Sequence, residues 1–159
     1  MKKMIFIIGL VGICLDQISK FLIINIFSVN DFHVVIENFF SIGYIKNKGA
    51  AWGIFSNSTL VLAVISLIFL FFMIKYVKES KNITKLESLS YGLIIGGIIG
   101  NLIDRLMRGY VIDFLSFKII NYDFPVFNIA DMLIVIGVIV AAFSVFVGGS
   151  YDDSGKRKY

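Results

Sequence analysis

The sequence is poor in the residues that build most metal and disulfide sites. Its 159 residues include one cysteine and one histidine. A single cysteine excludes an internal disulfide and a clustered thiolate site, and a single histidine excludes a histidine cluster for zinc. With His33 alone the chain offers no Ser-His-Asp set, and it has no glycine-rich phosphate loop. We therefore predict a protein that uses no metal and no other cofactor.

Charged residues are also scarce. They make up 16% of the chain against 58% hydrophobic residues, which is too little polar surface to coat a soluble protein of this size. We predict one integral membrane domain over residues 1–159, because four apolar spans leave little chain outside the bilayer. The spans are Met4 to Leu15 continuing past a polar break to Phe27, Thr59 to Ile74, Leu89 to Ile103, and Met132 to Gly149.

The cations are spread along the chain and form no stripe, so nucleic acid is not an expected partner. Nine of them flank the spans on one side, and by the positive-inside rule that side is the cytoplasm, with both termini in it. The nine are Lys2, Lys3, Lys75, Lys78, Lys81, Lys85, Lys156, Arg157 and Lys158, and the six on the other side are Lys20, Lys46, Lys48, Arg105, Arg108 and Lys118. Asp113 and Asp131 are accordingly predicted at the outer face.

The first span resembles a lipoprotein signal peptide, because an apolar stretch after two lysines ends at Cys14. However, Ile13 precedes the cysteine where a small residue is expected, and another apolar run follows, so we predict an uncleaved span. Packing at lipid depth is the favoured role for Cys14 over that of a nucleophile.

Two outer loops are long enough to fold. In residues 28–57, the stretch from Phe32 to Ile45 mixes aromatic and β-branched residues and predicts one or two strands on the membrane surface, followed by a turn of small residues with Trp52. A lid or cradle is plausible there. Residues 109–127 carry the only proline, Pro125, and a cluster of aromatics.

Polar residues gather at the outer ends of the spans. Asp16 and Lys20 are four apart and can pair on one helix face, either as a neutralising ion pair or with a direct functional role. In the third span, Gly96 and Gly100 form a small-residue face that admits a second helix or, as the alternative, an extended substrate. Arg105 can reach lipid headgroups, but beside several carboxylates we favour a bidentate contact that holds one of them.

Asp113 and Asp131 are the candidate catalytic pair, since carboxylates at the rim of a hydrocarbon layer are costly. Asn128 is a good N-cap, and an acidic residue three positions later suits the helix dipole without any catalytic role. Against that simpler reading, the loop between the two aspartates must return to one interface, so the carboxyls can meet. Two close carboxyl groups share a proton, and one can act as base on a water while the other acts as acid.

Five motifs together resemble those of bacterial lipoprotein signal peptidase, also called signal peptidase II. They occur in order over nearly the whole chain: Asp16-Gln17-x-Ser19-Lys20, Asn47-x-Gly49-Ala50-Ala51, Gly100-Asn101-x-x-Asp104-Arg105, Gly109-x-Val111-x-Asp113-Phe114 and Phe127-Asn128-x-Ala130-Asp131.

The resemblance implies an intramembrane aspartic endopeptidase of the bacterial cell membrane that cuts diacylglyceryl-modified prolipoproteins just before the lipidated cysteine. It implies four transmembrane helices, a small extracytoplasmic β cradle and a short surface helix, and it assigns the catalytic pair to Asp113 and Asp131. The expected partners are lipidated prolipoproteins and membrane lipid, and we expect a monomer. Residues that line or brace the pocket would be Asp16, Lys20, Asn47, Gly49, Asn101, Arg105 and Asn128, to which we add Asp104.

Two other classes of function stay open at this point. A small transporter or proton pathway also uses intramembrane acids, but it predicts acids spread through the membrane depth, whereas the second and fourth spans are uncharged through their middles. A lipid-modifying transferase would show an acidic cluster for a divalent metal, and Asp104 with Asp113 is a sparse one.

Overall fold

Four long helices dominate the structure, a computed structural model that describes residues 1–49 and 58–148. They are α1 (Lys2–Ile26), α2 (Thr59–Glu79), α3 (Lys85–Arg108) and α4 (Ile129–Gly148). Each is long and apolar enough to cross a membrane, and each contains or nearly contains one predicted span. The predicted four-helix membrane protein is confirmed.

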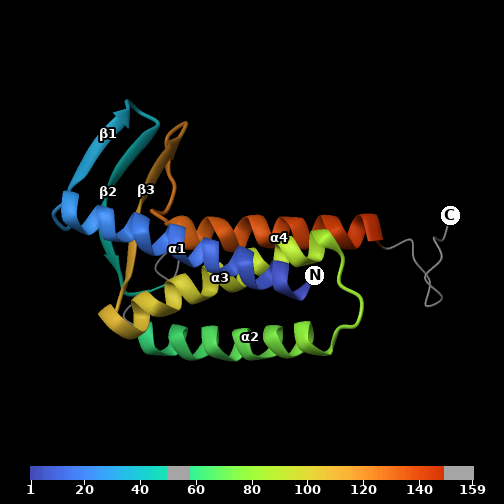
Figure 1. The fold of residues 1–159 in the computed structure, drawn as a ribbon. Helices are drawn as coiled ribbons and strands as arrows, with labels where there is room; N and C mark the ends of the chain where they lie inside the picture. The colour runs from blue at the N-terminus through green and yellow to red at the C-terminus, as the bar shows by residue number, and fades with distance from the viewer. Residues whose placement is uncertain (50–57, 149–159) are drawn as a thin grey trace.

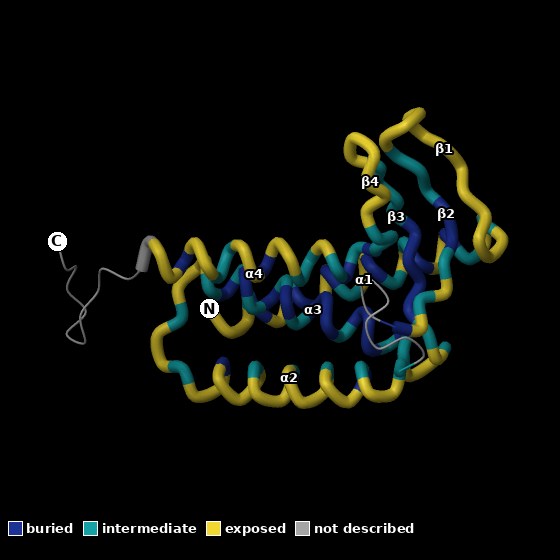
Figure 2. The backbone as a smooth tube through the Cα atoms, turned by 180° about the vertical axis from the view of Figure 1, so that it is seen from behind, coloured by how far each residue is buried: buried dark blue, intermediate teal, exposed yellow. Residues whose placement is uncertain are grey.

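Helix α3 is the centre of the bundle, because it packs against each of the other three helices (Figure 1). It approaches α1 closely: a Cβ atom on Gly96 would lie 2.9 Å from the carbonyl oxygen of Gly9. The small-residue face therefore serves helix packing, which was the favoured of the two readings. Helix α2 contacts only α3 extensively and is exposed along most of its length (Figure 2).

A four-stranded antiparallel sheet stands at one end of the bundle (Figure 1). Its strands, in spatial order, are β1 (Phe32–Ile36), β2 (Phe40–Asn47), β3 (Val111–Ile119) and β4 (Tyr122–Asp123). The first two confirm the strands predicted between Phe32 and Ile45, and the aromatic loop after α3 supplies the other two. Within the described ranges no short surface helix accompanies the sheet, and residues 50–57, with Trp52, lie outside those ranges.

Two features join the sheet firmly to the bundle. Helix α3 ends at Gly109, which adopts a left-handed conformation with φ of 75° and turns the chain directly into β3. Ile23 of α1 then packs with Tyr44, Ile112 and Phe114 in a buried apolar cluster at the base of the sheet. The buried residues concentrate in α3 and at this base (Figure 2), so the base of the sheet is a stable platform for polar side chains.

Candidate active site

Asp113 lies on β3 at the base of the sheet, and only 2% of its surface is exposed. In the register of β2 and β3, Asn47 pairs with Val111, so Asn47 and Asp113 are diagonal neighbours on one face. The Asn47 side-chain amide donates to Asp113 Oδ2 at 2.7 Å. Asn47 Oδ1 also accepts from the Gly49 N–H at 2.9 Å, which forms the tight turn predicted there.

Asp131 stands in the first turn of α4, where Asn128 caps the helix as predicted. The Asp131 N–H donates to Asn128 Oδ1 at 3.0 Å, and Asp131 Oδ2 accepts from the Asn128 N–H at 3.2 Å, a reciprocal capping arrangement. The chain entering α4 is held against β3, because the Phe127 carbonyl accepts from the N–H groups of Phe114 and Leu115. This return of the loop brings Asp131 beside Asp113.

We call Asp113 and Asp131 the aspartate pair, and Asn101 and Asn128 the amide bridge. The Asn128 side-chain amide donates to Asp113 Oδ1 at 2.7 Å, and the Asn101 side-chain amide donates to Asp131 Oδ1 at 2.8 Å. Each of the four carboxylate oxygens thus accepts one N–H bond. All of these donors are neutral amides.

Both aspartates line one cavity of about 600 Å³. Polar side chains occupy one part of its wall, and the apolar part is formed mainly by side chains of α4 and the preceding loop. The polar residues are Asn47, Asn101, Arg105, Asp113 and Asp131, and the main apolar ones are Phe124, Phe127, Met132, Val135 and Ile136. Because Met132, Val135 and Ile136 are also exposed on α4, the cavity is continuous with the lipid-facing side of the helix.

Asp113 has an unusual protonation equilibrium. Burial, and next the charge of the neighbouring Asp131, raise the pKa of the Asp113 carboxyl to about 7, against the opposing hydrogen bonds from Asn47 and Asn128. A carboxyl with a pKa near neutrality exchanges a proton readily at physiological pH.

A second buried carboxylate cluster lies next to the amide bridge. Lys20 Nζ is 2.9 Å from Asp16 Oδ2 and 2.9 Å from Asp104 Oδ2, and all three side chains are fully buried. We call these residues the lysine triad. The predicted Asp16–Lys20 ion pair is confirmed, and Asp104, on α3, is its third member.

The lysine triad also ties four elements together. Asp16 Oδ1, on α1, accepts from the Ala130 N–H at the start of α4 at 2.9 Å, and Asp104 Oδ2 accepts from the Ile112 N–H of β3 at 3.2 Å. Gly100 leaves room for the Asp16 carboxylate, since a Cβ atom on residue 100 would lie 2.6 Å from Asp16 Oδ2.

Arg105 differs from the sequence prediction. Within the described residues, the ion pairs include Arg108 with Asp104, at 2.9 Å, and none that involves Arg105. The bidentate carboxylate contact expected for Arg105 is not formed, because Lys20 and Arg108 already occupy Asp104 and the aspartate pair is held by amides. Arg105 lines the cavity instead.

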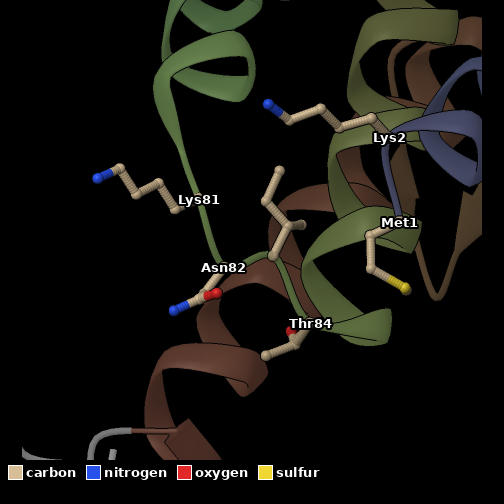
Figure 3. A pocket seen from close by; sticks show the side chains of 6 residues that line it. Met1, Lys2, Lys81, Asn82 and Thr84 are labelled. Atoms are coloured by element: carbon tan, nitrogen blue, oxygen red, sulfur yellow. The ribbon is translucent and has the colours of Figure 1, made fainter. Parts of the chain in front are cut away.

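Another cavity, of about 440 Å³, lies at the other end of the bundle (Figure 3). Its wall is formed by Met1, Lys2, Lys81, Asn82, Ile83 and Thr84. The Lys2 and Lys81 side chains extend in a similar direction in this view, and Lys2 Nζ donates to the Lys78 carbonyl at 2.7 Å. No carboxylate is among the described residues that line this cavity.

The profile of the signal peptidase (SPase) II family matches residues 8–147. The chain belongs to this family. The family is one of peptidases, so the transporter and the transferase readings are not supported. The family and its relative process lipoproteins, and the chain has four helices able to span a membrane. Both findings agree with the function that the five motifs implied.

Individual relatives agree with the family. The chain is 40% identical over 148 residues to the lipoprotein signal peptidase of Clostridium tetani (strain Massachusetts / E88), covering 92% of this chain and 95% of that protein. A bacterial membrane enzyme solved in meso at 2.3 Å superposes with a TM-score of 0.85 at 31% identity, covering 96% of this chain and 93% of that chain. A second, solved at 1.9 Å, gives 0.79 at 33% identity, covering 89% and 91%.

Sequence reasoning found the polar side of the cavity and missed its apolar side. Val135 follows Asp131 by four residues and Ile136 follows Met132 by four, and this helical spacing is a signal that could have placed these side chains along one side of the helix. Arg108, four residues after Asp104, carried a similar signal for the ion pair that it forms. In residues 1–49 and 58–148, no three His, Cys, Asp or Glu side chains are grouped as metal ligands.

Proposed function

We propose that this chain is an intramembrane aspartic endopeptidase that removes the signal peptide from diacylglyceryl-modified prolipoproteins, cutting just before the lipidated cysteine. The observation that carries this proposal is the aspartate pair: two carboxyls in one cavity, whose hydrogen-bond donors within residues 1–49 and 58–148 are neutral amides. Membership of the signal peptidase II family supports the same reaction.

In the proposed mechanism, Asp113 holds the proton and Asp131 is ionised. Asp131 removes a proton from a water molecule, whose oxygen attacks the carbonyl carbon of the scissile peptide bond. Asp113 gives its proton to the carbonyl oxygen, which yields a neutral tetrahedral intermediate. The intermediate then loses a hydroxyl proton to Asp113 as the C–N bond breaks, and Asp131 returns a proton to the leaving amine. The elevated pKa of Asp113, near 7, suits it to hold the proton before the reaction.

Other side chains of the cavity bind the substrate in this proposal. Arg105 has no carboxylate partner among the described residues, so its guanidinium can donate to backbone carbonyls of the bound peptide. Asn47 and Gly49 flank the cleavage position from the sheet side. The apolar wall along Met132, Val135 and Ile136 accommodates hydrocarbon of the substrate or of membrane lipid.

We further propose that the termini are cytoplasmic and that the sheet and the aspartate pair lie at the outer face, as the distribution of lysine and arginine indicates. Both carboxyls and their amide donors are supplied by one chain, so one copy suffices for the proposed reaction. We propose a single-domain enzyme that acts as a monomer, and that needs no metal or cofactor.

The test is cleavage of a lipidated prolipoprotein by the purified protein in detergent. We expect Asp113→Asn and Asp131→Asn each to reduce kcat by about 10³-fold or more, because each removes one half of the proton exchange. Asp123→Asn, an exposed aspartate on β4, is the matched control and should retain activity. Full cleavage by either pair variant would disprove the assignment of the pair, and abolition of activity by a chelator would show that a metal takes part.

A further inference from the structure

The amide bridge presents its donors, and not its oxygens, to both aspartates. Each asparagine side chain has one accepting oxygen and one donating nitrogen, and a rotation by half a turn exchanges them. If Asn101 were rotated, its oxygen would face Asp131 and would repel the ionised carboxylate. Something in the protein must therefore select the orientation that is present.

The lysine triad provides that selection. The Lys20 ammonium has three N–H donors and no acceptor. Asp16 and Asp104 accept two of them, each at 2.9 Å, and Asn101 Oδ1 accepts the third at 3.0 Å. Because a buried ammonium cannot leave a donor unpaired at low cost, the Asn101 oxygen must face Lys20.

The selected orientation passes to the second asparagine. Once the Asn101 oxygen faces Lys20, its nitrogen faces Asp131 Oδ1, at 2.8 Å. The same oxygen also accepts from the Asn128 nitrogen at 3.1 Å, and that nitrogen donates to Asp113 Oδ1 at 2.7 Å. Asn128 Oδ1 is then left to accept the Asp131 N–H.

We infer that Lys20 is a positioning residue that orients the Asn101 and Asn128 side chains so that both donate to the aspartate pair. This inference rests on the proposed function of the pair, and it assigns to Lys20 a specific action through Asn101 in place of general bracing. The aspartate pair is formed by Asp113 on β3 and Asp131 on α4, and the charged groups around it are Lys20 and Asp16 on α1 and Asp104 and Arg105 on α3.

The test is a double-mutant cycle measured in single-turnover cleavage of a lipidated prolipoprotein. We expect Lys20→Met to lower the rate by about 30-fold, the size expected for loss of a hydrogen bond to a charged group, with substrate affinity little changed. In Asn101→Leu, the same lysine substitution should change the rate less than about twofold, because the residue through which Lys20 acts is absent. An equal fold-loss in both backgrounds would overturn the inference.

A pH profile separates positioning from simple stabilisation. The charge of Lys20 lowers the pKa of Asp113, and Asp113 must keep its proton in the proposed mechanism, so the alkaline limb of the rate profile should move to higher pH in Lys20→Met. An unchanged limb with lowered thermal stability would show a purely structural role. Arg108→Gln is the control, because it removes a cation that contacts Asp104 but not Asn101, and its limb should not move.

If Lys20→Met fails to fold, the cycle is repeated with Asp16→Asn and Asp104→Asn added, which removes the unpaired buried charges and keeps their acceptor oxygens for Ala130 and Ile112. The same non-additivity is expected, and full additivity would again overturn the inference. Failure of the proposed function gives a different result, since the unmodified protein would then not cleave the substrate or Asp131→Asn would cleave it normally.

Discussion

The lysine triad and the aspartate pair are two carboxylate clusters in the same bundle end that differ in their partners. Asp16 and Asp104 share a fully buried lysine, and Asp104 has an arginine as well. In the described part of the chain, the donors to Asp113 and Asp131 are amide N–H groups. The first cluster has cations that balance its charge, whereas no cation of the described residues forms an ion pair with the second.

This difference explains why we propose only one of the two clusters as catalytic. Removing one partner of a buried ion pair leaves an uncompensated charge, so such a cluster serves structure. Where two neighbouring carboxyls accept hydrogen bonds from neutral amides, one of them can stay protonated near neutral pH, as the pKa of Asp113 near 7 indicates. Counting buried acids does not distinguish the two roles, whereas their immediate partners do.

The same isosteric change at both clusters tests the comparison most directly. Asp104→Asn leaves Lys20 and Arg108 with one charged partner fewer and should lower the free energy of unfolding by about 3–5 kcal/mol. Asp131→Asn removes a like charge beside Asp113 and should leave that free energy nearly unchanged while activity is lost. Chemical unfolding in detergent measures both, and equal losses would remove the distinction between the clusters.

Arg105 and Arg108 extend the comparison to cations. Arg105→Ala should reduce kcat/KM by about 30-fold without loss of stability, because Arg105 lines the cavity and has no carboxylate partner in the described part of the chain. Arg108→Ala should keep the cleavage rate and lose a little stability through Asp104. The opposite assignment of the two effects would place Arg108, and not Arg105, in substrate binding.

The pH dependence of stability gives the smallest expected effect. The folded-state pKa of Asp113, about 7, is above its usual value of 3.8, so its contribution to stability is full below about pH 4 and is lost as the pH rises through 7. The amide introduced by Asp113→Asn would resemble the protonated acid at every pH. We therefore compare the Tm of the variant with that of the unmodified protein at two pH values. The difference, variant minus unmodified, should be a few degrees larger at pH 8 than at pH 5. An equal difference in Tm at both pH values would contradict the elevated pKa.

Local sequence patterns were sufficient for most of the fold. The apolar runs predicted the four helices, and the polar segment at Asp16 and Lys20 did not interrupt α1 because the two side chains pair four residues apart on one face. The Asn128 cap and the strands near Phe32 also followed from local patterns. β3 was not predicted, since it pairs with β2, a segment about 70 residues away, and such pairing cannot be recognised from a local pattern of polar and apolar residues.

The residue types of the site, their order and the membrane-spanning helices followed from the sequence, because hydrophobic length and capping act over a few neighbouring residues. The partners of those residues did not. That Lys20 binds Asp104 as well as Asp16, and that Asn101, 81 residues away, turns its oxygen toward Lys20, came from the packing of α1 against α3. Which carboxylates receive a cation and which receive only amides depends on contacts between distant segments, so only the tertiary structure separated the structural acids from the proposed catalytic ones.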